Sequence, residues 1–314
     1  MTSVISTVAV CPTLAHGASI SGDLVLGVVM TDTLVIFASG GTTGRGQVVR
    51  TVPLSAGGPL VVVDTTPFHP VDHAWPDQPG DTGWIDDQVV IDSVMVASGR
   101  GGDLLVAADI PVKRGEPGWS WHVAHRLAEN ATLPEVGTQV QLAVDTQRRS
   151  ALSAAHTACH LAALAMNGAA AHLWRKEVRL DSLGSPDLDQ LAMESSAMDE
   201  GGSTDIYRFG KSLRKRGFDS AGFADQIEAI VAGVHTRLET WIATRAPVAI
   251  IDGGDQRVTA LRHWTCALPE GLADIACGGT HVSDLGAFSA VRVAYELAAD
   301  GTGLTVRTTP SLAA

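Results

Sequence analysis

The sequence contains few cysteines and few aromatic residues. Only 4 of its 314 residues are cysteine and 5% are aromatic. The cysteine spacing is not that of a small disulfide scaffold, so we expect a reduced intracellular protein. Few aromatics together with 33 glycines favour many turns and close backbone contacts, and hence a sizeable β component. The cysteines are Cys11, Cys159, Cys266 and Cys277.

The sequence also lacks a long uninterrupted apolar run. The first residues, MTSVISTVAVCPTLAHGAS, have neither the basic start nor the apolar core of a signal peptide. The most apolar early segment, LVLGVVMTDTLVIFAS, is interrupted by Thr31, Asp32 and Thr33. A membrane-spanning helix needs about 20 consecutive apolar residues. We therefore expect a cytoplasmic protein with no membrane partner.

Positive charge is scarce, because the formal net charge is −12. That balance excludes a broad nucleic-acid footprint, so any nucleic acid would have to be bound by a local basic patch. The best candidate patch is YRFGKSLRKRG with part of the preceding WRKEVR segment, which offers Arg208, Lys211, Arg214, Lys215, Arg216, Arg175, Lys176 and Arg179. The alternative is that these basic residues form a solvated surface and bind no RNA.

Short β-rich runs occupy residues from about 22 to 110. They are DLVLGVVM, TLVIFAS, PLVVVDTTPF, DQVVIDSVMVAS and DLLVAAD, separated by glycine, proline and aspartate clusters. This rhythm favours an antiparallel barrel or sandwich. We assign residues 1–112 to an antiparallel β domain, either a barrel or a sandwich. Residues 113–145, rich in turn formers, are expected to form a linker followed by one strand at QLAV.

Residues 146–314 have a different character and are expected to form an α+β domain. TQRRSALSAAHTACHLAALAMNG predicts one long helix that ends near Asn167 and Gly168. FADQIEAIVAGVHTRLETWIATR predicts a second helix. Strands are expected at VAIIDGG, TALRHWTCAL, GAFSAVRVAYEL and GLTVRTT. The predicted fold class of the whole chain is therefore α+β.

Two short motifs, HTACH and CGGTH, could share one metal ion. His156 and His160 are one helical turn apart, so their side chains leave one face of the predicted helix. The two glycines of CGGTH allow a tight turn that would bring Cys277 and His281 together. Histidine and cysteine suit zinc. We predict a Zn²⁺ site with these four residues as ligands.

The role of the metal stays open at this level. Four protein ligands are typical of a closed structural zinc site, whereas a catalytic site needs access for water or substrate. Thr157 stands where the HExxH proteases have glutamate, which excludes that class. No residue of the sequence stands out as a general base.

The two motifs resemble those of the editing domain shared by alanyl- and threonyl-tRNA synthetases and the freestanding alanyl-tRNA editing proteins. DTTPFHPVDHAWPDQPGDTG and VDTQRRSALSAAHTACHLA are similar to further signatures of that family. WRKEVRLDSLGSPDLDQLA and IYRFGKSLRKRGF resemble its longer bacterial subgroup, often described as metal-dependent hydrolases. The resemblance covers residues from about 55 to 310.

The resemblance implies a glycine-rich, antiparallel β-barrel-like N-terminal domain, residues 1–112, and an α+β editing-type domain with zinc in a cleft. It implies hydrolysis of the ester that joins a wrong amino acid, usually serine, to the 3′ end of tRNA. His156, His160, Cys277 and His281 match the zinc ligands. Thr66 matches a threonine that contacts the serine hydroxyl, and Gln78 matches a glutamine that closes a glycine-rich segment. A site that pairs a hydroxyl can reject an analogue lacking it.

Two segments depart from the family pattern. DHAWPD, residues 72–77, replaces a run of glycines and either reshapes the substrate mouth or forms a plain surface turn. ELAADGTGLTVRT, with acidic Glu296 and Asp300, replaces a basic segment, which weakens the expected contact with phosphates.

Four functions are compatible with the sequence. The first is a trans-acting aminoacyl-tRNA deacylase, with Ser-tRNA(Ala) as the expected substrate. The second is an aminoacyl transferase that passes the aminoacyl group to a small amine or hydroxyl in specialised metabolism. The third is a non-enzymatic, zinc-stabilised binding module, which would unfold without its metal. The fourth is a metal-dependent hydrolase of some other ester or amide. The sequence does not indicate an oligomeric state.

Overall fold

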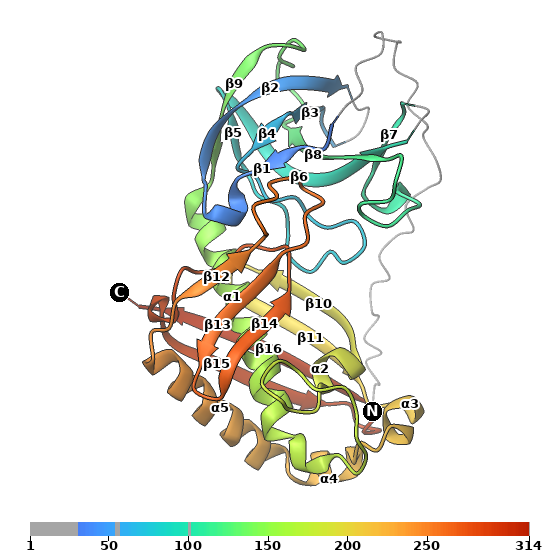
Figure 1. The fold of residues 1–314 in the computed structure, drawn as a ribbon, viewed down its shortest axis with the longest axis vertical. Coiled ribbons are helices and arrows are strands. Elements are labelled where there is room, and N and C mark those ends of the chain that lie inside the picture. Colours follow the sequence, from blue (N-terminus) through green and yellow to red (C-terminus); the bar gives the residue numbers. More distant parts are fainter. Residues whose placement is uncertain (1–30, 54–56, 100–101, 314) are drawn as a thin grey trace, which may run out of the picture.

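The structure, a computed structural model, describes residues 31–53, 57–99 and 102–313. The fold is mixed α+β (Figure 1). The predicted run DLVLGVVM and Cys11 lie outside the described residues. Within them, no helix is long and apolar enough to cross a membrane.

The N-terminal part is a seven-stranded antiparallel sheet with the order β5-β9-β2-β3-β8-β6-β7. Strand β5 pairs with β9 and also with β6, which links the two sides of the sheet. A short parallel pair, β1 with β4, lies beside it. The strands are β1 Leu34–Val35, β2 Thr43–Val52, β3 Leu60–Val63, β4 Thr65–Thr66, β5 Gly83–Ile85, β6 Gln88–Ser98, β7 Leu104–Val106, β8 Ser120–Leu127 and β9 Gln139–Val144, with the 3-10 turns η1 Phe37–Ser39 and η2 Ala107–Asp109.

Strand β3 shows why this sheet is stable. All four of its residues are buried. Because side chains alternate across a strand, Val61 and Val63 join the apolar cluster on one face, while Leu60 and Val62 join the cluster on the other. The sequence LVVV therefore has no polar position.

The prediction of a linker at residues 113–137 is wrong for its central part. Strand β8 lies in the middle of the sheet, hydrogen-bonded to β3 and β6. Its sequence, SWHVAHRL, breaks the apolar pattern with His122 and His125, yet both histidines are buried. Burial lowers the pKa of each to about 4, so they are neutral at pH 7 and can lie inside a sheet.

The C-terminal part places two long helices against a four-stranded sheet. Helix α1 packs against α5 and against the sheet, and α5 covers β15. The sheet order is β10-β11-β16-β15, and β12, β13 and β14 form a separate three-stranded sheet. The elements are α1 Thr146–Ala169, η3 Ala171–Leu173, α2 Leu188–Ala192, β10 Met193–Asp199, β11 Gly202–Arg208, α3 Lys211–Lys215, α4 Ser220–Asp225, α5 Ile227–Ala243, β12 Val248–Ile251, β13 His263–Leu268, β14 Gly271–Ala276, η4 Leu285–Ala287, β15 Phe288–Leu297 and β16 Gly303–Leu312.

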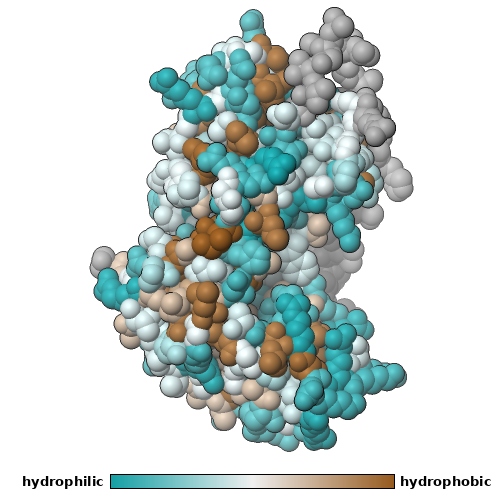
Figure 2. Space-filling model, viewed as in Figure 1, coloured by the Kyte–Doolittle hydropathy of each residue, from teal (hydrophilic) through white to brown (hydrophobic). Residues whose placement is uncertain are grey.

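The predicted long helix is confirmed as α1, and Asp145 caps it by accepting hydrogen bonds from the amides of Gln147 and Arg148. The second predicted helix is divided at Gln226 into α4 and α5. The four C-terminal strand predictions are confirmed as β12, β13, β15 and β16, whereas β10, β11 and β14 were not predicted. Figure 2 shows apolar residues scattered among hydrophilic ones on the face it presents.

Candidate metal centre and its cavity

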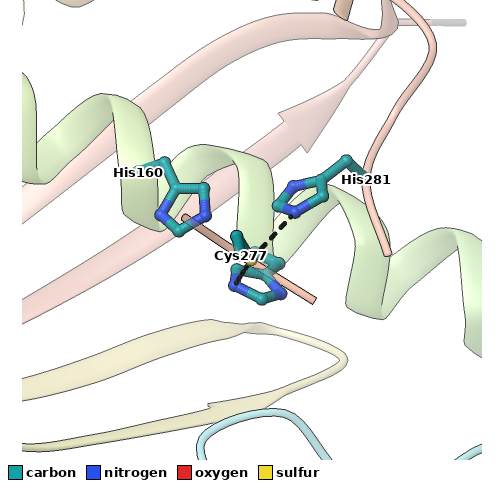
Figure 3. A group of neighbouring side chains, drawn as sticks. His160, Cys277 and His281 are labelled. Atoms are coloured by element: carbon teal, nitrogen blue, oxygen red, sulfur yellow. Dashed lines mark hydrogen bonds between the residues drawn. The ribbon is translucent and has the colours of Figure 1, made fainter. Parts of the chain in front are cut away.

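The HTACH and CGGTH motifs meet in space. Helix α1 carries His156 and His160, and the loop after β14 carries Cys277 and His281. One ligand atom from each lies within 4.8 Å of those of the other three. Cys277 Sγ is 3.4 Å from Nε2 of His156 and 3.4 Å from Nε2 of His281 (Figure 3). The predicted convergence is confirmed, and the group could hold a metal ion.

Gln78 fixes the orientation of His156. Gln78 Oε1 lies 2.7 Å from His156 Nδ1, so that nitrogen carries the proton and Nε2 is free to face the cluster. The same oxygen accepts a hydrogen bond from the Thr280 amide at 3.1 Å, and Gln78 Nε2 donates to Thr280 Oγ1 at 2.9 Å. The resemblance makes Gln78, like Thr66, a candidate catalytic residue, and this stays a prediction. Its contacts connect the loop of one motif to a histidine of the other, and it also lines the cavity described below.

Thr157 orients His281 in the same way. The Thr157 hydroxyl donates to the Ser153 carbonyl at 2.9 Å, so its oxygen can accept from His281 Nδ1 at 3.2 Å. His281 Nε2 is then left free toward Cys277. The third histidine, His160, has a buried Nε2 with no hydrogen-bond partner among the described residues. Two imidazoles therefore turn unprotonated nitrogens toward Cys277, and the third, His160, has a ring nitrogen that no described residue uses, which suits a metal ion.

Gly279 is required by the close approach of the loop to His156. A Cβ at this position would lie 2.2 Å from His156 Cε1 and 2.3 Å from its Nδ1. The neighbouring Gly278 has more space, because a Cβ there would be 3.7 Å from Arg114 Nη1. The second glycine of CGGTH is thus the one that allows the two motifs to meet.

Burial keeps the ligand side chains uncharged. It lowers the pKa of His160 to about 4 and the pKa values of His156 and His281 well below their usual range. It raises the pKa of Cys277 to about 12. Neutral imidazoles are ready to bind a cation, whereas the thiol would lose its proton to a bound metal. The donor set, three histidines and one cysteine, suits zinc.

Asp77, which the sequence analysis did not single out, lies beside the cluster. Its Oδ2 is 3.9 Å from His156 Nε2. Burial raises the pKa of this carboxyl to about 6. Asp77 belongs to DHAWPD, the segment for which a surface turn was one alternative. Only its position one residue before Gln78 could have pointed to it.

A cavity of about 690 Å³ opens onto the cluster. His156, His160 and Cys277 line it, so three of the four candidate ligand residues border the cavity. The lining follows α1 from His156 to Asn167, a distance of about 16 Å at 1.5 Å per residue. Further lining residues come from both parts of the chain, including Phe37, His69, Asp72 and Arg114 from the N-terminal part and Arg179, Asp189 and Arg262 from the C-terminal part.

The end of the cavity away from the cluster is acidic. Asp181, Asp187 and Asp189 line it, and Asn167 Nδ2 donates to the first two. Burial raises the pKa of Asp187 and raises that of Asp189 to about 6. Arg179 offsets part of this charge, with its Nε 3.1 Å from Asp187 Oδ2. This arm therefore favours cationic groups.

Thr66 is placed away from the cavity lining. It is fully buried, and its hydroxyl lies 2.8 Å from His125 Nε2 while accepting from the Phe68 amide at 3.1 Å. His125 Nδ1 lies 3.0 Å from the Val61 carbonyl and donates to it, so the Thr66 hydroxyl donates to Nε2. Both hydrogen-bonding functions of this hydroxyl are used inside the protein. The structure does not bring Thr66 to the metal cluster.

The predicted basic patch gathers around α3. Lys176 Nζ donates to the Lys215 carbonyl at 3.0 Å, which joins the segment before α2 to α3. Arg208, Lys211 and Arg214 line a surface hollow of about 650 Å³. Arg175 is paired with Asp219, and Arg208 with Glu194. Lys215 is the last residue of α3, and Arg216 follows it. Arg179 lies apart from the patch, in the main cavity.

The patch adjoins the cavity at one residue. Met193, the first residue of β10, lines both the surface hollow and the main cavity. The surface hollow and the main cavity are therefore neighbours at Met193.

Comparison of the chain with protein-family models and with curated proteins found no match.

Proposed function

We propose that this protein is a zinc-dependent, trans-acting aminoacyl-tRNA deacylase of the cytoplasm. The observation that carries the proposal is the place of His156, His160 and Cys277 in the lining of a cavity of about 690 Å³. A structural zinc site is closed by its ligands, whereas a catalytic one keeps an open position. The resemblance of HTACH and CGGTH to editing domains supports the proposal. The pairing of β5 with both β9 and β6 supports a barrel-like N-terminal domain.

Zinc bound here would supply a Lewis acid for the ester carbonyl and lower the pKa of a bound water toward about 7. The chain's own residues provide the orientation. Gln78 and Thr157 hold the two imidazoles whose nitrogens face Cys277. Asp77, 3.9 Å from His156 Nε2, is placed to accept a hydrogen bond from the substrate's amino group. An aminoacyl ester is already activated, so modest catalysis suffices.

The tRNA would approach from the basic patch. Arg208, Lys211 and Arg214 surround the outer hollow, and its contact with the main cavity at Met193 gives a route inward. Phosphate neutralisation by such side chains supplies affinity that decreases with salt. The preference for serine rests on the family resemblance, because the Thr66 hydroxyl is engaged by His125 and Phe68.

The test is release of labelled amino acid from Ser-tRNA(Ala), Gly-tRNA(Ala) and Ala-tRNA(Ala). The zinc-loaded protein should release serine, and His156→Ala/Cys277→Ala should release none. A matched control, His172→Ala/Cys266→Ala, removes the same residue types outside the cluster and should retain activity. No release from any substrate by folded, zinc-loaded protein would contradict the proposal.

The acidic arm favours a second candidate, an aminoacyl transferase with a small amine as acceptor. Asp181, Asp187 and Asp189 would attract an ammonium group within the same cavity as the metal cluster. Incubation of the protein with Ser-tRNA(Ala) and a panel of small amines distinguishes the two. A new amide product, formed faster than free serine, would support transfer. Free serine alone at every amine concentration would support hydrolysis.

Removal of the metal distinguishes the two proposed enzymatic functions from a zinc-stabilised binding module. The apolar clusters of the two parts contain dozens of buried side chains distant from the ligands. We therefore expect a chelator to abolish activity while circular dichroism keeps its folded signal. Unfolding on chelation at 25 °C would favour the binding module.

A further inference from the structure

Arg262 is a buried cation beside the metal cluster. Only 2% of its surface is exposed, and it lines the main cavity. Its Nη2 donates to the Arg257 carbonyl at 2.8 Å and its Nη1 to the Ala260 carbonyl at 3.4 Å. Its Nε is buried with no hydrogen-bond partner in the described part of the chain.

No carboxylate among the described residues forms an ion pair with Arg262. Burial lowers its pKa, the carboxylates of Asp252 and Asp255 act in the opposite direction without pairing with it, and a guanidinium remains charged at pH 7. A buried charge without a counter-charge is unfavourable, and an unmade hydrogen bond adds to this. Arg262 therefore lacks the anionic partner that its position requires.

The surroundings of Arg262 place that partner next to the ligands. The Arg262 carbonyl accepts a hydrogen bond from the Cys277 amide at 2.9 Å, so the two residues are neighbours across the backbone. The Phe37 ring covers the guanidinium, with its centroid 5.5 Å from Cζ, and Phe37 also lines the cavity. Arg114, a second lining residue, is paired with Asp72 at 3.0 Å. Arg114 Nη1 lies 3.7 Å from where a Cβ on Gly278 would be.

The lining of the cavity differs between its two ends. Near Cys277, Arg114 is paired with Asp72 and Asp77 lies beside His156, whereas Arg262 has no carboxylate partner among the described residues. Asp181, Asp187 and Asp189 line the other arm, together with Arg179. An anionic group near the metal cluster would therefore find its free cation in Arg262.

We propose that Arg262, assisted by Arg114, binds the phosphate of the terminal nucleotide that carries the ester. This rests on the proposed function, because an aminoacyl ester of a tRNA end has no free carboxylate and its nearest anion is that phosphate. A guanidinium fork matches the geometry of phosphate oxygens and can donate two parallel hydrogen bonds.

A purely structural role for Arg262 explains less. Its two bonds to the carbonyls of Arg257 and Ala260 hold the turn before β13. They leave a charged residue that lines the cavity with a buried Nε that has no partner among the described residues. A structural role predicts loss of stability on substitution, whereas an anion subsite predicts loss of a charge preference.

The experiment measures the affinity of zinc-loaded protein for adenosine 5′-monophosphate and for adenosine. We expect the nucleotide to bind at least about tenfold more tightly than adenosine. The reason is that a hydrogen bond to a charged group strengthens binding by about tenfold or more. In Arg262→Gln the preference should fall to within about threefold, and Arg262→Lys should retain part of it. Arg257→Gln is the matched control. It removes the same charge from the same loop, where the exposed side chain pairs with Asp255, and should keep the full preference.

Zinc content and the thermal midpoint of each variant show that it is folded. Equal affinity of the wild-type protein for the two ligands would overturn the proposal. So would an undiminished nucleotide preference in folded Arg262→Gln.

Hydrolysis of aminoacyl-tRNA by the same proteins separates this proposal from the proposed function. A nucleotide preference that depends on Arg262, without any hydrolysis, would support the phosphate subsite and contradict the deacylase proposal. Hydrolysis with the same KM in the wild-type and Arg262→Gln proteins would contradict the phosphate subsite and support the deacylase proposal.

Discussion

At the scale of single residues, the metal cluster is prepared by hydrogen bonds behind it. Gln78 and Thr157 hold the Nδ1 protons of two histidines and so direct Nε2 toward Cys277. Both partners are themselves fixed, Gln78 by Thr280 and Thr157 by the Ser153 carbonyl. Such partners of metal ligands determine the tautomer and limit rotation of the ring.

Substitution of Gln78 by alanine should weaken zinc binding. The His156 ring would lose the acceptor at 2.7 Å that fixes its tautomer. We expect a decrease in affinity of about 10- to 100-fold, measured by competition with a chelator of known affinity. Gln190→Ala, which removes an exposed glutamine bonded only to its neighbours, is the control. Unchanged zinc affinity in Gln78→Ala would refute this role.

The two glycines of CGGTH should differ in their tolerance of a side chain. Gly279→Ala places a Cβ 2.2 Å from His156 Cε1, so either the ring or the loop must shift. Gly278→Ala meets nothing closer than 3.7 Å. We expect zinc affinity to fall more than tenfold in the first variant and to change less than about threefold in the second. Equal zinc affinities for the two variants would contradict the close packing of Gly279 on His156.

At the scale of elements, strand β8 shows how neutral histidines are used inside a sheet. His122 is 1% exposed, and neither of its ring nitrogens has a hydrogen-bond partner in the described residues. Burial therefore lowers the pKa of His122 to about 4, below its ordinary value of 6.5. Protonation of this side chain opposes folding.

Substitution of His122 by leucine should make the protein less sensitive to acid. The folded-state pKa lies below the unfolded one, so the stability linked to neutral His122 is present above pH 6.5 and lost as pH falls toward 4. Relative to His122→Leu, the wild-type free energy of unfolding should fall by on the order of 2 to 3 kcal/mol over that interval. Urea unfolding of both proteins at pH 4, 5, 6 and 7 measures it. A constant difference across these pH values would contradict the prediction.

At the scale of the whole molecule, one buried ion pair joins the two parts of the chain. Arg149, in the first turn of α1, donates from Nε to both carboxylate oxygens of Asp81, at 2.9 and 3.1 Å. Its Nη2 also donates to the Pro67 carbonyl at 2.8 Å. Asp81 in turn accepts from the His69 amide at 2.5 Å. These bonds hold the N-terminal sheet on the helix that carries two metal ligands.

Removal of one member of this pair should be strongly destabilising. Arg149→Met leaves Asp81 buried without its cation, which costs about 3 to 5 kcal/mol. The adjacent Arg148 pairs with Glu200, whose side chain is 55% exposed, so Arg148→Met should cost less than about 1 kcal/mol. Denaturant unfolding compares the two variants. Similar losses for both would show that the Arg149 pair does not join the parts.

Local pattern was sufficient for some predictions and insufficient for others. The apolar and alanine-rich helix, the strands β12, β13, β15 and β16, and the four clustered ligands followed from local pattern, because helix periodicity and motif spacing are properties of short segments. Strand β8 did not, because its histidines become neutral only when the sheet buries them. The role of Asp77 depends on His156, which lies 79 residues away in the sequence. The role of Arg262 depends on the lack of a hydrogen-bond partner for its Nε among the described residues.

The sequence by itself determined the donor set, the helical spacing of His156 and His160, and the scarcity of cationic surface. Each of these depends on residue type and local geometry alone. Only the tertiary structure decided that three of the ligands line a cavity, that the Thr66 hydroxyl is engaged elsewhere, and that Arg262 lies near Cys277 while three aspartates line the other arm. Those properties depend on which distant side chains are buried together, and burial sets both their charge and their free hydrogen-bonding groups.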